Sequence, residues 1–72
     1  MNKNLNQRFG LRVKELRHHQ HISQEELSFR CGLSKNYISD VERGTRNISL
    51  QAIAKLANGL KVEVKELFYF SK

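Results

Sequence analysis

The chain has 72 residues, which is enough for one domain and too few for several. Thirteen Lys and Arg stand against seven Asp and Glu, and the resulting net charge of +6 favours nucleic acid as a partner first and an acidic membrane second. A domain of this size has little room for the walls of a deep pocket, which argues against an enzyme and against a small-molecule substrate. The hydrophobic fraction of 39% is too high for a disordered basic tail.

Cysteine and histidine usage excludes other classes. The single cysteine, Cys31, cannot close a disulfide within the chain, and this suits a reducing cytoplasm. The sequence HHQH, residues 18–21, lacks a nearby carboxylate or cysteine at metal-ligand spacing, so we expect neither a metal nor a cofactor. No apolar run is long enough to cross a bilayer, no signal peptide is expected, and no grouping of residues suggests catalysis.

Periodicity and turn residues predict short helices throughout the chain. In the first helix, Phe9, Val13 and Leu16 share one face. A second helix begins at Ser23, which with Glu26 forms a capping-box pattern in which each side chain would bond the other residue's amide.

That second helix ends at Gly32, and a third runs from a Ser34 cap to Gly44. Ser49 caps a fourth helix, and a short fifth is expected from Val64 to Tyr69. The predicted fold is all-α, a compact bundle of five short helices in one domain spanning residues 1–72.

Residues 24–43, QEELSFRCGLSKNYISDVER, carry the most specific pattern. Counted from Gln24, the fifth residue is small, the ninth is glycine, and five others are apolar at inward-facing positions. These apolar residues are Leu27, Cys31, Leu33, Ile38 and Val41. Two helices that cross steeply over a turn of about three residues need this arrangement, which is typical of the helix-turn-helix.

Residues 9–68 resemble the lambda-repressor-like, Xre-type DNA-binding domain, through FGLRVKELR, ISQEELS and YISDVERGTRNIS. Within that family the chain is most similar to restriction–modification controller proteins. This resemblance implies a transcription regulator that binds paired operators as a homodimer. It also implies that the fourth helix runs to Leu60, although Gly59 offers a competing stop signal.

The first turn of the third helix is the expected base reader, because the N-terminal side chains of such a helix reach base edges in the major groove. Lys35 can donate to guanine, Asn36 can pair with adenine, and the resemblance implies base readers at both positions. Tyr37 would stack on a sugar or a thymine methyl, or pack over Lys35, and Ser39 also points outward. Asp40 would repel a phosphate, so it must meet a base amine or point away from the duplex.

A second set of residues is expected to contact the DNA backbone. Gln24 opens the second helix, whose N-terminus favours a phosphate, and Ser34 opens the third. The resemblance implies further backbone contacts from Arg43, Arg46 and Asn47 around the following loop.

The resemblance also implies one structural role, and the apolar residues at the carboxyl end suggest a second. Arg17 and Glu42 match residues that form an ion pair between the first and third helices. At the carboxyl end, a helix this short cannot bury four consecutive large apolar residues alone, so a two-fold dimer interface is expected within residues 60–70. The residues assigned to this interface are Leu67, Phe68, Tyr69 and Phe70.

The sequence therefore predicts a cytoplasmic, homodimeric regulator that binds double-stranded DNA and that could also contact RNA polymerase. A small phage-type repressor shares the same pattern. An antitoxin or another protein-interaction module on the same fold is the alternative class, because a fold does not determine a function. A membrane-surface role is disfavoured, because Glu25, Glu26, Asp40 and Glu42 prevent the basic charge from segregating to one face.

Overall fold

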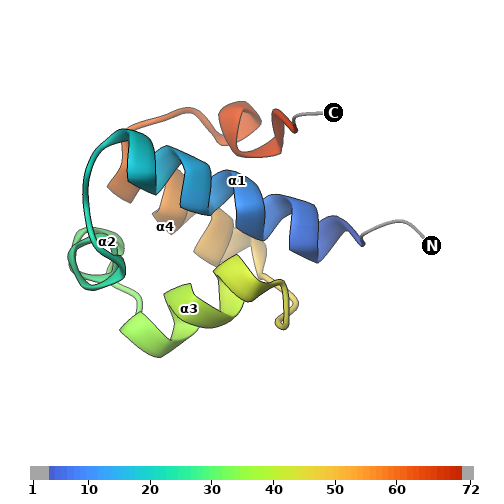
Figure 1. The fold of residues 1–72 in the computed structure, drawn as a ribbon, viewed down its shortest axis with the longest axis horizontal. Coiled ribbons are helices and arrows are strands. Elements are labelled where there is room, and N and C mark those ends of the chain that lie inside the picture. Colours follow the sequence, from blue (N-terminus) through green and yellow to red (C-terminus); the bar gives the residue numbers. More distant parts are fainter. Residues whose placement is uncertain (1–3, 71–72) are drawn as a thin grey trace.

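The computed structural model describes residues 4–70, which form four α-helices and one 3-10 helix, with no strand among them. In Figure 1, α1 runs between the carboxyl-terminal 3-10 helix on one side and α3 on the other. None of the helices in this range has the length and apolar character needed to span a bilayer. The elements are α1 Leu5–His19, α2 Gln24–Cys31, α3 Lys35–Arg43, α4 Leu50–Leu60 and η1 Val64–Phe68.

Each α-helix begins with a side-chain cap. The predicted caps Ser23, Ser34 and Ser49 each accept a hydrogen bond of 3.0 Å from the amide three residues later. The sequence analysis missed the α1 cap, Asn4, whose Oδ1 accepts from the Gln7 amide at 2.8 Å. Caps of this kind each stabilise a helix by about 1 kcal/mol.

The Ser23–Glu26 capping box forms only in part. Ser23 accepts from the Glu26 amide, but the Glu26 carboxylate accepts from Arg30 Nε at 3.0 Å, one turn further along α2. The expected return bond to the Ser23 amide is replaced by this ion pair, because an arginine at i+4 is within easy reach of a helical glutamate.

Left-handed residues end three of the helices. Gly32 and Gly44 have φ angles of 73° and 76°, a conformation that glycine adopts without a Cβ clash. Lys61 has a φ of 59° and ends α4 after Leu60, so Leu60 rather than Gly59 is the terminus.

The fifth element differs from the sequence prediction. It is a 3-10 helix that ends at Phe68, not an α-helix that ends at Tyr69. Its N-cap residue, Glu63, makes no side-chain cap hydrogen bond within the described chain. A segment of five residues without such a cap gains little from α-helical hydrogen bonds, and the tighter turn is common in short pieces.

One continuous core lies between all five elements, and it includes four of the five apolar helix-turn-helix positions predicted from the sequence, while the fifth, Leu33, is partly buried and packs against it. Phe9 and Val13 from α1 meet Ile38 and Val41 from α3. The remaining members of the cluster are Leu16, Leu27, Cys31, Leu56, Ala57, Leu60 and Leu67. This packing fixes one face of α3 and leaves its other faces to solvent.

Two helical glycines allow the closest approaches in this core. A Cβ on Gly10 of α1 would collide with the Val41 carbonyl oxygen and lie 2.9 Å from the Glu42 carbonyl oxygen of α3. A Cβ on Gly59 of α4 would collide with the Cys31 sulfur. Burial of Cys31 raises the pKa of its thiol to about 11, which fits an inert core residue.

We predict that Gly10→Ala lowers the free energy of unfolding by about 2 kcal/mol. Its methyl group meets backbone atoms that cannot rotate away, and overpacking of this kind outweighs the better helix propensity of alanine. Urea denaturation measures the difference, with Asn58→Ala on the exposed side of α4 as a control that should be neutral or slightly stabilising. A Gly10→Ala protein as stable as the parent would show that α1 and α3 lie further apart.

Candidate nucleic-acid interface

The helix-turn-helix consists of α2, α3 and the turn between them. The Gly32 amide donates to the Ser28 carbonyl at 2.9 Å, and the Leu33 amide donates to the same carbonyl at 3.1 Å. Ser28 is buried, and its hydroxyl donates to the Glu25 carbonyl at 2.7 Å, so it brings no unpaired polar group into the contact between helices. These two hydrogen bonds tie the start of the turn to the end of α2.

The predicted ion pair between Arg17 of α1 and Glu42 of α3 is present and buried. Arg17 Nε and Nη2 donate to the two carboxylate oxygens at 2.7 and 3.0 Å, which is a bidentate contact. Arg17 Nη1 also donates to the Ile22 carbonyl at 2.9 Å, just before α2. A third partner, Gln24 Nε2, donates to Glu42 Oε1 at 3.0 Å. This network joins α1, α2 and α3 at one point.

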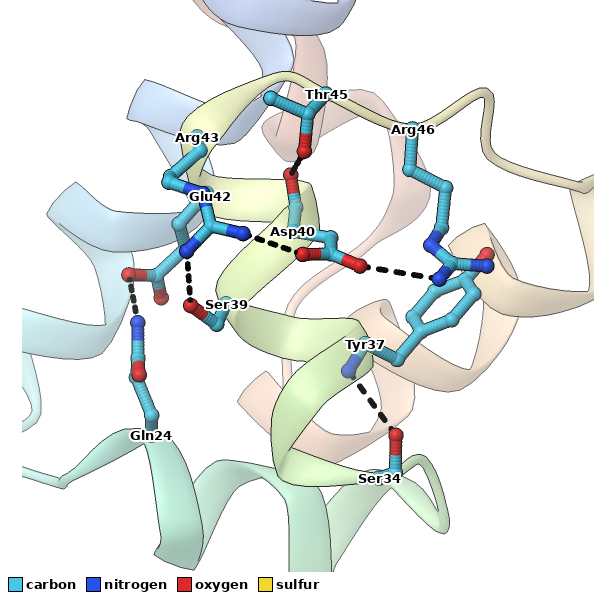
Figure 2. A network of polar contacts seen from close by, with 9 residues as sticks. All are labelled: Gln24, Ser34, Tyr37, Ser39, Asp40, Glu42, Arg43, Thr45 and Arg46. Atoms are coloured by element: carbon cyan, nitrogen blue, oxygen red, sulfur yellow. Dashed lines mark hydrogen bonds and ion pairs between the residues drawn. The ribbon is translucent and has the colours of Figure 1, made fainter.

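Gln24 therefore has a role that the sequence analysis did not assign. Its amide nitrogen faces inward to Glu42, as Figure 2 shows, while the side chain is only partly buried. The phosphate contact predicted at this place can still be made by the backbone amides of the helix N-terminus, which carry the positive end of the helix dipole.

The first turn of α3 presents its side chains to solvent. Lys35 and Asn36 are both exposed, directly after the Ser34 cap. The opposite face of the helix, with Ile38, is buried. Because the buried face is fixed by the core, the exposed pair occupies the position from which a recognition helix reaches base edges.

A second polar network covers the remaining outward face of α3 and the loop after it (Figure 2). Asp40 Oδ1 accepts from Arg43 Nη2 at 2.6 Å, and its other oxygen accepts from Arg46 Nη2 at 3.0 Å. Arg43 Nη1 also donates to the Ser39 hydroxyl at 3.0 Å. The Arg46 guanidinium lies over the Tyr37 ring, 4.6 Å from its centroid.

This network corrects one expectation, because Tyr37 packs against Arg46, not over Lys35. Arg43 and Arg46, the expected contacts to the DNA backbone, are both bound to Asp40 in the single chain. The spacing of Asp40 and Arg43 is typical of a helical ion pair, so that contact could have been foreseen. Arg46 lies beyond the Gly44 turn, and its return to Asp40 depends on a loop conformation that no local pattern specifies.

The other loop residues are placed by contacts within the chain. The Thr45 hydroxyl donates to the Asp40 carbonyl at 3.3 Å. Asn47 Oδ1 accepts from Asn6 Nδ2 at 2.8 Å, which ties the loop to the start of α1. The assigned residues on α3 and this loop therefore lie on one side of the molecule, whereas η1 packs against α1.

The four apolar residues assigned to a dimer interface lie in different environments. Leu67 is fully buried in the core of the single chain, so it has no exposed surface for a partner, in contrast to the sequence prediction. Phe68 is partly exposed and contacts Phe9 and Phe70, with ring centroids 5.1 and 6.1 Å apart. Tyr69 is 69% exposed. The first large apolar residue of the segment completes the core, and only those after it are available.

Comparisons with known proteins agree with this geometry. A family model described as helix-turn-helix matches residues 13–67. The chain is 44% identical to control protein C.BamHI of Bacillus amyloliquefaciens over 72 residues, which is 99% of this chain and 89% of that protein. It is 39% identical to control protein C.MunI of a Mycoplasma species over 62 residues, which is 85% of this chain and 84% of that protein.

Among solved structures, the fold is similar to that of the restriction-modification controller protein C.AhdI from Aeromonas hydrophila. The TM-score is 0.86 and the sequence identity is 49%, with 88% of this chain and 96% of that chain covered. The similarity therefore extends over most of both chains.

We predict that Glu42→Ala lowers the free energy of unfolding by about 3–5 kcal/mol, because it leaves the buried Arg17 charge without a partner. The double substitution Arg17→Met with Glu42→Leu should regain most of the loss, since apolar groups of similar size can replace a buried pair. Urea denaturation of the two proteins gives both values.

Glu15→Gln is the matched control, because it breaks a more exposed pair in which Glu15 Oε1 lies 2.8 Å from Arg12 Nη1. Its cost should stay below about 1 kcal/mol. If Glu42→Ala remained fully folded and merely altered the choice of DNA site, the structural role given to the pair would be wrong.

Proposed function

Because this chain belongs to the helix-turn-helix family and is related over nearly its whole length to restriction–modification control proteins, we propose that it is a sequence-specific DNA-binding transcription regulator of the controller type. The observation that carries this proposal is the exposed first turn of α3, which stands out from a rigid helix pair beside the arginines of the following loop. The proposal includes a cytoplasmic location, because a transcription regulator must have access to DNA.

In the proposed complex, α3 lies in the major groove. Lys35 donates to guanine O6 and N7, and Asn36 pairs with adenine N6 and N7. Tyr37 and Ser39 extend this surface along the helix. Residues at its margin contact the sugar-phosphate backbone: Gln24, Ser34, Arg43, Arg46 and Asn47.

The protein acts in this proposal as a homodimer on a palindromic operator. Tyr69, Phe68 and Val64 leave apolar surface exposed at the carboxyl end, on the η1 side of α1. A two-fold contact through this surface would cover it and would place two copies of α3 on half-sites roughly 34 Å apart. Association would also add to the small core of a domain of this size. The proposal also includes a contact with RNA polymerase, because a regulator bound beside a promoter lies close to the polymerase.

The affinity should depend steeply on salt. With about four phosphate contacts in each subunit, a plot of log K against log salt should slope near −7, because binding releases the counterions of about eight phosphates. Fluorescence anisotropy with a labelled duplex, over a range of about 50–300 mM salt, measures this slope. A flat response, or no binding, would contradict the proposal and would favour a protein-interaction module.

Substitutions should separate base readers from backbone contacts. Lys35→Ala or Asn36→Ala should reduce discrimination at one base pair by about 1–3 kcal/mol, since each removes a base-edge hydrogen bond. Arg46→Ala should weaken binding to all sequences by a similar factor. Selection of bound sequences from a random DNA pool shows the difference. An unchanged preference in both α3 variants would show that α3 does not read the bases.

A further inference from the structure

Asp40 lies in the middle of the outward face of α3. It follows Asn36 by four residues and precedes Arg43 by three, so the three side chains share one side of the helix. The buried side is set by Ile38 and Val41. An acidic residue therefore stands at the centre of the surface that the proposed function turns toward DNA, whose phosphates it repels.

The carboxylate of Asp40 is already occupied by two cations of the same surface. Arg43 Nη2 and Arg46 Nη2 bind its separate oxygens at 2.6 and 3.0 Å, and the Asp40 side chain is 25% exposed (Figure 2). Tyr37 supports Arg46 from the other side through its ring. One anion thus offsets one of the two positive charges and holds both guanidinium groups against α3.

We propose that Asp40 determines specificity in this interface by disfavouring contacts that involve phosphate alone. This inference rests on the proposed function, which it deepens. In a complex without base recognition, Arg43 and Arg46 must leave Asp40 to reach phosphates, and the freed carboxylate then lies beside the same phosphates. Both effects weaken binding to arbitrary DNA.

A complex with the matching sequence removes this penalty. When α3 is seated in the groove, its outward face meets base edges, and cytosine N4 and adenine N6 present amine donors there. A carboxylate has about four acceptor positions, so when Arg43 and Arg46 turn to the phosphates, Asp40 can accept from a base amine in their place. The carboxylate is then favourable at a cognate site and unfavourable elsewhere.

The test uses the full chain and two duplexes of equal length. One duplex carries the sequence that the unaltered protein selects from a random pool, and the other is a scrambled version of the same composition. Asp40→Asn should bind the scrambled duplex about eightfold more tightly for each subunit at 0.1 M salt, and therefore about sixtyfold for the dimer, since loss of one negative charge resembles one additional neutralised phosphate. Its affinity for the selected duplex should not rise, so the ratio of the two affinities should fall by about sixtyfold.

Two control variants accompany this measurement. Glu15→Gln removes one negative charge, also from a helical ion pair, but its partner Arg12 bonds the Glu66 carbonyl of η1, so the pair lies on the other side of α1 from α3. It should leave the affinity ratio within about twofold of the original, because exposed charges further away than a Debye length are screened. Asp40→Glu keeps the charge and should keep binding to the scrambled duplex weak.

The outcomes separate the two levels of the account. If Asp40→Asn changed the affinity for both duplexes equally, Asp40 would act only through its charge and not through specificity. If the affinity for neither duplex changed, Asp40 would not belong to the DNA-binding surface. Either result overturns this inference while leaving DNA binding intact. If the unaltered protein selects no sequence and binds both duplexes alike, the proposed function itself fails, and the inference fails with it.

Discussion

The buried contact between Arg17 and Glu42 is the interaction on which the orientation of the helix-turn-helix depends. It joins α1 to α3, while Ile22 and Gln24 add α2 to the same network. A buried ion pair stabilises a fold little compared with apolar packing, but it is costly to break on one side only. It therefore penalises any arrangement of α3 that separates the two side chains, and this confers orientation more than overall stability.

Close packing and capping act together with this pair. Gly10 lets α1 approach the carbonyl groups near the end of α3, and Gly32 and Gly44 end α2 and α3 sharply. With its inner face and both ends fixed, α3 has little freedom to rotate about its axis. The side chains of its first turn are therefore presented by a rigid element, which is what recognition by shape and hydrogen bonding requires.

Local sequence patterns predicted much of this architecture. Three helix caps, two glycine termini and the apolar helix-turn-helix positions follow from spacing, because each depends on residues close together in the chain. The Arg17–Glu42 pair links residues far apart in sequence, and it came only from resemblance to a known family. Features that depend on tertiary context were missed: the 3-10 form of η1, the burial of Leu67, and the return of Arg46 to Asp40 and Tyr37. In the last case, helical spacing finds Arg43 but not a residue beyond a glycine turn.

The central claim is that the outward face of α3, with the loop after it, is the surface that meets DNA. Chemical-shift mapping with an isotope-labelled protein and a selected duplex tests this most directly. The account predicts that the largest amide shifts fall within residues 34–47, while exposed residues of α4 such as Lys55 and Asn58 change little. Shifts concentrated on α4 or η1, with residues 34–47 unmoved, would contradict it.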